Sequence, residues 1–220
     1  MVAIYSKSYI GSFAQGVPQS IIRKGAFSIM GKTTEPIRSK KELQDLANYF
    51  LLRGQYRNYA MIIMATCTAL RISDLLRLRW DDVYNEKRGK FNSHLTLVEH
   101  KTGKQKTIAL NQQILQALRL YLPHRRGEYI FSNGRRKEAP ISRVQAWRII
   151  KAAVAAIGIV GKIACHSLRK TFGYHAWVEQ NISPVVIMQI YNHSSYDVTR
   201  RYLGITQDEL DKAYLCMELF

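Results

Sequence analysis

The stretch Cys165-His166-Ser167-Leu168-Arg169-Lys170-Thr171-Phe172 places an imidazole three residues before a guanidinium. Residues i and i+3 of a helix lie on one face, so a helix here would present His166 and Arg169 together. Two further stretches follow: Tyr191-Asn192-His193-Ser194-Ser195 and Arg200-Arg201-Tyr202-Leu203-Gly204. One C-terminal segment therefore carries two imidazoles, a guanidinium and a phenol among apolar residues.

These side chains suit chemistry on a phosphate ester. Arg binds phosphate oxygens through two parallel hydrogen bonds and stays charged. His exchanges protons near neutral pH, and Tyr can act as a covalent nucleophile. Together they predict attack on a phosphate by Tyr202. The chain has 13 tyrosines, and three others near this segment stay open as nucleophiles: Tyr191, Tyr196 and Tyr214.

A second informative stretch lies upstream, at residues 68–80. Core-type apolar residues flank Arg71 on both sides there, which is unusual for a surface arginine. Asp74 follows three residues later and would hold the guanidinium by a charge-assisted hydrogen bond. A purely structural Arg–Asp pair is the alternative.

The composition favours a polyanionic partner. Lys and Arg total 33 against 16 Asp and Glu, which gives a formal net charge of +17 over 220 residues. Such a balance favours nucleic acid ahead of a membrane surface, with a ribosomal-type or merely soluble basic protein as the alternative. At 47% hydrophobic residues the chain can bury a core. Its length fits one large domain or one domain plus an arm.

Cysteine usage and the lack of targeting signals favour a cytoplasmic protein. The three cysteines, Cys67, Cys165 and Cys216, lie far apart without a Cys-x-x-Cys pair, which favours reduced thiols. No apolar run is long enough to cross a bilayer, and charged residues interrupt the N-terminal region. Cys165 and His166 have no further Cys or His at ligand spacing, so no metal site is expected.

Apolar spacing and capping residues predict a mostly helical α+β fold. Two alternating stretches, 94–98 and 106–110, predict an antiparallel β-hairpin with a basic tip at 99–105. A short strand is expected at 128–131. Helices are expected at 40–50, 57–70, 73–79, 112–121, 142–157, around His166 and Arg169, at 184–190 and after Thr206.

In this order, these residues resemble the motifs of the tyrosine recombinases, the family of phage integrases and Xer-type resolvases. The resemblance is to the catalytic domain and covers residues 36–216. Arg71 falls in the family's first arginine motif with Asp74 as its acidic partner, and His166 with Arg169 forms the His-x-x-Arg box. Three further positions match the family: Lys101 in Lys101-Thr102-Gly103, His193 in Asn192-His193-Ser194-Ser195, and Tyr202.

The resemblance implies a reaction and a role for each residue. Tyr202 attacks the scissile DNA phosphate, forms a 3′-phosphotyrosyl bond and frees a 5′-hydroxyl, without metal, ATP or another cofactor. His166 is the general base and Lys101 the general acid, with Lys104 and Lys106 as rivals for that second role. The remaining residues act on the phosphate itself: Arg71 and Arg169 stabilise its charge and His193 hydrogen-bonds to it.

The chain departs from the family in two places. Members usually carry a separate N-terminal helical domain that clamps the other face of the DNA, and residues 1–35 are too short for it. We expect an N-terminal arm or extension at 1–35 and the catalytic domain at 36–220. The chain is then a stand-alone module, like the fimbrial-switch recombinases, or part of a longer parent. Where many members have Leu-Gly-His, this chain has Tyr191-Asn192-His193.

The expected partner is double-stranded DNA, bound by a dimer or tetramer in which a C-terminal helix at 206–220 docks on a neighbouring protomer. An accessory DNA-bending or clamp protein would supply the remaining contacts with the DNA. Two other functions stay open: a DNA-binding or architectural protein that keeps the fold, and a type IB topoisomerase. Five basic residues are candidates for contacts to the DNA backbone: Lys104, Arg135, Arg136, Arg143 and Arg200.

Overall fold

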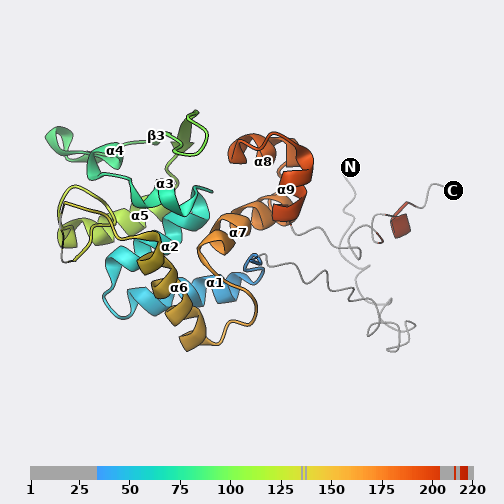
Figure 1. Cartoon of the computed structure of the whole chain (residues 1–220), viewed down its shortest axis with the longest axis horizontal. Coiled ribbons are helices and arrows are strands. Elements are labelled where there is room, and N and C mark those ends of the chain that lie inside the picture. Colours follow the sequence, from blue (N-terminus) through green and yellow to red (C-terminus); the bar gives the residue numbers. More distant parts are fainter. Residues whose placement is uncertain (1–33, 135, 137, 204–210, 212–213, 218–220) are drawn as a thin grey trace, which may run out of the picture. The chain divides into compact units, whose positions relative to one another are not determined.

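The structure is a computed structural model, and it describes residues 34–134, 136, 138–203, 211 and 214–217 (Figure 1). Four longer helices surround the main core: α1 (Lys40–Leu51), α2 (Tyr56–Cys67), α5 (Gln112–Tyr121) and α6 (Arg143–Ile157). Two short helices, α3 (Ile72–Leu76) and α4 (Trp80–Val83), follow α2. The C-terminal part consists of α7 (Cys165–Val178), α8 (Pro184–Tyr191) and α9 (Tyr196–Leu203).

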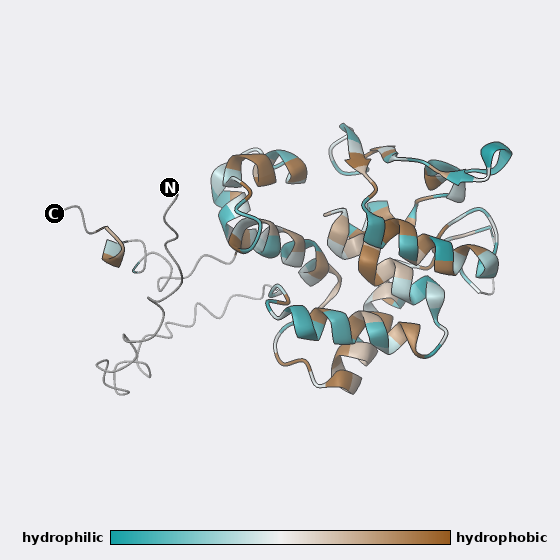
Figure 2. Cartoon of the chain, turned by 180° about the vertical axis from the view of Figure 1, so that it is seen from behind, coloured by the Kyte–Doolittle hydropathy of each residue, from teal (hydrophilic) through white to brown (hydrophobic). Residues whose placement is uncertain are grey.

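Side-chain caps set where several helices begin. Ser39 Oγ accepts a hydrogen bond from Glu42 N at 3.2 Å before α1, and Asn111 Oδ1 accepts one from Ile114 N at 2.9 Å before α5. Ser142 and Gln145 form a reciprocal capping box before α6. These bonds satisfy backbone donors that a helix leaves unpaired at its first turn. Figure 2 shows hydrophilic and hydrophobic residues on the same helices, as expected where one face packs on a core.

The apolar interior has two parts. The larger cluster contains Leu46, Phe50, Met61, Met64, Ile114, Leu118 and Ile150, all buried. The smaller cluster contains Ala69, Ala176, Ile187, Tyr191 and Leu203. Ala69 follows α2, whereas the other four residues lie on α7, α8 and α9. The smaller cluster therefore packs the three C-terminal helices against the end of α2.

The predicted hairpin and the predicted α+β class are confirmed. Strands β3 (His94–Val98) and β4 (Gln105–Ala109) pair antiparallel, from His94 opposite Ala109 to Val98 opposite Gln105. A second pair, β1 (Tyr84–Asn85) with β2 (Lys90–Phe91), encloses the 3-10 helix η1 (Glu86–Arg88) and was not predicted. Strands of two residues are too short to show alternating hydrophobicity.

Two sequence predictions are wrong in detail. Residues 128–131, which follow the 3-10 helix η2 (Leu122–His124), do not form a strand. Tyr129 forms an isolated bridge with Arg79, and Ser132, the residue after this range, forms another with Pro140. The helix predicted at 57–70 ends at Cys67. Ala69 has a left-handed backbone with φ 55°, a conformation that ends the helical hydrogen-bond pattern.

The segment before α1 packs on α7. Ile37 is buried, and its backbone N–H donates to Thr171 Oγ1 at 2.9 Å. Lys170 Nζ donates to the carbonyl of Thr34 at 2.5 Å. Of the arm predicted at 1–35, residues 1–33 lie outside the described part of the chain. The helix predicted at 206–220 also lies outside it, apart from residues 211 and 214–217.

Gly173 provides a test of how tightly α7 and α8 pack. A Cβ at this position would collide with Tyr191 Oη and lie 3.1 Å from Tyr191 Cε2. Tyr191 is fully buried, and its hydroxyl donates to the carbonyl of Arg169 at 2.7 Å. We expect Gly173→Ala to lower the free energy of unfolding by about 1–3 kcal/mol through overpacking, measured by urea denaturation.

The matched control is Gly134→Ala, because a Cβ there would meet no atom within 4 Å. Equal unfolding midpoints for the two variants would contradict the packing argument.

Candidate active site

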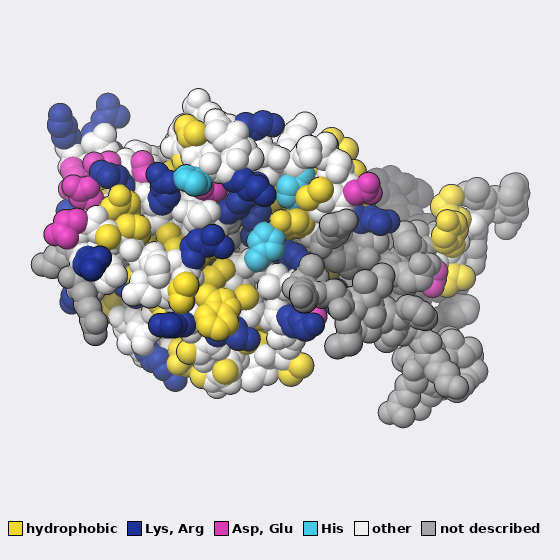
Figure 3. Space-filling model, in the orientation of Figure 1, with side chains coloured by type: hydrophobic (Ala, Val, Ile, Leu, Met, Phe, Trp, Pro, Cys, Tyr) yellow, Lys and Arg dark blue, Asp and Glu magenta, His cyan; other side chains and the backbone are white. Residues whose placement is uncertain are grey.

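A surface cleft of about 1300 Å³ collects residues from five separate elements. It is lined by Arg71 at the start of α3, Lys101 in the β3–β4 turn, His166 on α7, His193 between α8 and α9, and Tyr202 on α9. Five of the six predicted catalytic residues thus share one cleft. On the face shown in Figure 3, histidine side chains lie among Lys and Arg side chains.

His166 and Tyr202 are in direct contact. His166 Nε2 lies 2.8 Å from Tyr202 Oη, and the two rings meet edge to face with centroids 5.1 Å apart. Burial around the imidazole, followed by the charges of Arg169, Lys170 and Arg71, lowers the pKa of His166 to about 4. The imidazole is therefore neutral at pH 7 and can accept the phenol proton.

Arg169, the sixth predicted residue, lies behind the cleft. It is 1% exposed, and its guanidinium donates to the carbonyl of Ala69 and, at 3.0 Å, to the carbonyl of Tyr191. It also lies over the Tyr191 ring, 4.6 Å from the centroid. Arg169 Nε has no hydrogen-bond partner within the described ranges. The guanidinium is thus fixed by backbone carbonyls and keeps a donor free.

Arg71 has a closer acidic partner than the predicted one. Its Nη1 lies 3.0 Å from Glu99 Oε1 and 4.0 Å from Asp74 Oδ2. Asp74 Oδ1 instead accepts the backbone N–H of His100 at 3.1 Å. Asp74 therefore reaches Arg71 only at long range and holds the turn that precedes Lys101.

Sequence reasoning missed Glu99. Its side chain is fully buried, and its Oε2 accepts hydrogen bonds from Thr102 Oγ1 at 2.8 Å and Asn192 Nδ2 at 3.0 Å. Burial would raise the pKa of this carboxyl, but the hydrogen bonds from Asn192, Thr102 and Arg71 outweigh it and the pKa is lowered. The only signal in the sequence was an acidic residue at the end of an otherwise basic hairpin turn.

His193 lies beside the tyrosine in a loop with left-handed backbone. Asn192, the residue before it, has φ 53° and ψ 38°. His193 Nδ1 lies 3.0 Å from Thr199 Oγ1, and its ring centroid lies 4.7 Å from that of Tyr202. Burial and the charges of Arg169 and Arg71 lower the pKa of His193 to about 4.

The three candidate lysines differ in their surroundings. Lys101 is exposed and lines the cleft. Lys106 Nζ donates to the carbonyl of Ile190 at 2.6 Å, and burial together with the charge of Arg169 lowers its pKa to about 8. Lys104 is exposed, and its backbone N–H donates to Thr102 Oγ1 at 3.4 Å. The geometry brings Lys101 to the cleft.

The residues predicted to contact DNA are spread over several sites. Arg143 lines the cleft in the first turn of α6, with the exposed Trp147 beside it. Arg136 lines a separate hollow of about 720 Å³ together with Arg148. Arg200 is exposed on α9. Arg135 lies outside the described residues. These assignments stay predictions.

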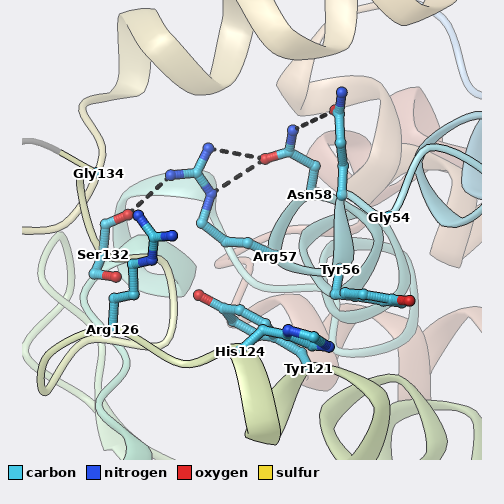
Figure 4. A pocket seen from close by; sticks show the side chains of 10 residues that line it. Gly54, Tyr56, Arg57, Asn58, Tyr121, His124, Arg126, Ser132 and Gly134 are labelled. Atoms are coloured by element: carbon cyan, nitrogen blue, oxygen red, sulfur yellow. Dashed lines mark hydrogen bonds between the residues drawn. The ribbon is translucent and has the colours of Figure 1, made fainter.

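Another hollow, of about 470 Å³, lies at the start of α2 and contains none of the predicted site residues (Figure 4). Arg57 donates there to the carbonyl of Ser132 at 2.9 Å and to Asn58 Oδ1. The rings of Tyr56 and His124 stack with centroids 4.5 Å apart. The guanidinium of Arg57 thus ties α2 to the loop that follows η2.

Only one of the three cysteines, Cys165, lines the cleft. Burial raises the pKa of the Cys165 thiol to about 11 and also raises that of Cys67, whereas Cys216 is exposed. Among the described residues, no three His, Cys, Asp or Glu side chains lie close enough to share a metal ion. No helix in that part of the chain is both long and apolar enough to span a bilayer.

The cleft thus brings Tyr202 into contact with His166 and beside His193, with Arg71 in the same lining and the Arg169 guanidinium 6.0 Å from the Tyr202 ring centroid. The family model for the phage integrase family matches residues 39–209. The chain belongs to this family, the tyrosine recombinases. The predicted family is therefore confirmed, and with it the class of enzymes that break and rejoin DNA.

Two curated relatives differ in how much of their own length this chain covers. The probable integrase/recombinase YoeC of Bacillus subtilis is 38% identical over 181 residues, which cover 82% of this chain and 94% of YoeC. Tyrosine recombinase XerA of Pyrococcus furiosus is 29% identical over 185 residues, which cover 83% of this chain but 62% of XerA. The chain thus spans nearly all of one relative and less than two thirds of the other.

Solved structures agree on the fold. A crystal structure of XerA recombinase superimposes with a TM-score of 0.68 at 22% identity, covering 86% of this chain and 66% of that one. A lambda integrase dimer bound to a COC′ core site gives a TM-score of 0.62 at 20% identity, covering 79% of this chain and 49% of the integrase.

The lowered pKa of His193 predicts how stability depends on pH. The folded-state pKa is about 4 against an ordinary value of 6.5, so between these values the unfolded chain binds a proton that the folded chain rejects. The stabilisation is complete above about pH 6.5 and is lost as the pH falls towards 4. We expect the melting temperature of wild type to fall more steeply than that of His193→Gln between pH 7 and 4.5.

The carboxylates titrate in both proteins, so the difference between the two curves isolates the histidine. Parallel curves over this range would contradict a neutral, partly buried His193.

Proposed function

We propose that this chain cuts and rejoins DNA at specific sites through a covalent 3′-phosphotyrosyl intermediate. The observation that carries the proposal is the 2.8 Å contact between His166 Nε2 and Tyr202 Oη inside the cleft that Arg71 and Lys101 also line. Binding alone would not need a phenol paired with a neutral imidazole.

In the proposed first step, Tyr202 Oη attacks the scissile phosphorus. The bond from Oη to phosphorus forms, and the bond from phosphorus to the 5′ oxygen breaks. His166 Nε2 takes the phenol proton as this happens. A free phenol titrates near pH 10, so Tyr202 needs a neutral base in contact with Oη that takes the proton as the new bond forms.

The arginines stabilise the charge on the non-bridging oxygens. Arg169 is fixed by the carbonyls of Ala69 and Tyr191, and Arg71 is held by Glu99. Neither guanidinium has to be ordered when DNA arrives, which lowers the cost of reaching the transition state. His193, fixed by Thr199, donates to the phosphate from its other nitrogen.

Lys101 protonates the leaving 5′ oxygen. Its place in an exposed turn that also lines the cleft fits a donor that approaches the phosphate from the side opposite the tyrosine. The phosphotyrosyl bond conserves the energy of the broken phosphodiester. A 5′-hydroxyl from the same or another strand then reverses the steps, without ATP or another cofactor.

The substrate is double-stranded DNA. The net charge of +17 supports a large phosphate footprint. Arg143, beside the catalytic residues, contacts the backbone next to the scissile phosphate, and Lys104, Arg135, Arg136 and Arg200 contact it farther away. Which bases are read depends on side chains that reach the grooves.

Assembly and domain layout extend the proposal. Residues 1–35 are an arm, residues 36–220 are the catalytic domain, and two or four chains act together on paired sites, with residues 206–220 docking between protomers. The lambda integrase that shares this fold is a dimer bound to a COC′ core site, which supports the idea that two chains of this protein act together on DNA. A separate clamp or DNA-bending protein completes the contacts with DNA. The complex works in the cytoplasm.

Replacing the nucleophile tests the reaction. On a nicked suicide duplex the 5′ fragment diffuses away after cleavage, so the covalent adduct accumulates and runs as a shifted band on a denaturing gel. We expect an adduct with wild type and none with Tyr202→Phe, although both bind the duplex.

An adduct formed by Tyr202→Phe would move the nucleophile to another tyrosine. Binding by both proteins without any adduct would favour an architectural protein, and supercoil relaxation without paired sites would favour a topoisomerase.

A substrate with sulfur in place of the 5′ bridging oxygen tests the general acid. A thiolate leaves without a proton, so this substrate does not need the acid. We expect Lys101→Ala to slow adduct formation about 10²–10⁴-fold on the normal duplex and to match wild type on the sulfur duplex. If the sulfur duplex instead restored adduct formation by Lys106→Ala to the wild-type rate, the general acid would be Lys106.

A further inference from the structure

One buried carboxylate contacts three elements of the site. Glu99 directly follows the hairpin strand β3, and its side chain is fully buried. Oε1 forms an ion pair with Arg71 Nη1 at 3.0 Å, while Oε2 accepts hydrogen bonds from Thr102 Oγ1 and Asn192 Nδ2 at 2.8 and 3.0 Å. A buried charge is tolerated only with such partners, so Glu99 requires all three groups to be in place.

The backbone of the same residue closes the turn that carries Lys101. Glu99 N donates to the carbonyl of Lys104 at 3.0 Å, and Gly103 N donates to the carbonyl of Glu99 at 2.8 Å. Asp74 adds a bond to His100 N at 3.1 Å. The position of the Lys101 backbone is thus set by bonds that converge on Glu99.

Asn192 tolerates the left-handed backbone conformation at its position and also supplies the amide that donates to Glu99. Its φ of 53° lies in the left-handed region, which glycine adopts freely and asparagine tolerates better than other residues. A glycine here would keep the loop but would lack the amide that reaches Glu99. The hairpin also contacts the end of α8 just before Asn192, where Lys106 Nζ donates to the carbonyl of Ile190 at 2.6 Å.

We propose that Glu99 is a positioning residue that couples the Lys101 turn to the His193 loop through Asn192 while it holds Arg71. The inference rests on the proposed function for the roles of Lys101 and His193, but the coupling itself is a property of the folded chain. Loss of the Asn192 amide loosens a turn that lies 88 or more residues away in the sequence. The general acid then spends less time beside the phosphate.

Asn192→Gly tests the coupling without straining the backbone. Asn181 offers a matched control, since it has φ 52° and is exposed between α7 and α8, so Asn181→Gly makes the same change elsewhere. Hydrogen exchange read at the amides of Glu99 and Gly103 reports closure of the turn. We expect about tenfold faster exchange at these amides in Asn192→Gly, the scale of one lost charge-assisted bond, and no change in Asn181→Gly.

Asn192→Asp gives a second variant of nearly identical shape. A carboxylate there faces Glu99 with like charge, so the exchange should be at least as fast as in Asn192→Gly. This measurement needs neither DNA nor activity. Unchanged exchange in both Asn192 variants, or an equal increase in Asn181→Gly, would overturn the proposal even if the recombinase chemistry stands.

The suicide duplex adds a chemical readout. If Asn192 acts through the lysine turn, Asn192→Gly slows adduct formation about tenfold on the normal duplex and matches wild type when sulfur replaces the 5′ bridging oxygen. A merely structural defect slows both substrates equally, and that result would overturn the coupling to Lys101. If wild type forms no adduct on either duplex, the proposed function fails while the exchange result still decides the coupling.

Discussion

The buried guanidinium of Arg169 holds the two sides of the cleft at a fixed separation. It donates to the carbonyl of Ala69, two residues before Arg71, and to the carbonyl of Tyr191, two residues before His193. A left-handed alanine costs about 1–2 kcal/mol, and an unpaired buried cation would cost more. Each feature therefore depends on the other: the turn at Ala69 aims its carbonyl at the guanidinium, and the guanidinium stabilises the turn.

A second constraint acts on the other arginine. Arg71 is paired with the buried carboxylate of Glu99 at 3.0 Å, so this guanidinium has an acidic partner within the folded chain. Hydrogen bonds from Thr102 and Asn192 lower the pKa of Glu99 and keep it ionised. The ion pair with this carboxylate then fixes the orientation of the Arg71 guanidinium. The site therefore combines a buried arginine, Arg169, held by backbone carbonyls with a partly exposed arginine, Arg71, held by a carboxylate.

Much of the site could be predicted because its residues follow local rules. A His and an Arg three apart on a helix, a lysine in a hairpin turn and a tyrosine in the C-terminal segment are visible in the sequence alone. Glu99 could not be predicted, since its partners lie 28 residues before it and 93 residues after it. The strand wrongly predicted at 128–131 and the early end of α2 have a related reason: the isolated bridge at Tyr129 and the left-handed Ala69 are fixed by tertiary contacts and leave no periodic pattern.

The different environments of the three thiols have a practical consequence. Cys165 directly precedes His166 in the sequence, yet burial keeps its thiol protonated, and burial also raises the pKa of Cys67. Alkylating reagents attack thiolates, so at neutral pH they react first with the exposed Cys216. A single fluorophore can therefore be attached near the C-terminus of the unmodified chain, and its emission would report where that terminus goes when protomers meet on DNA.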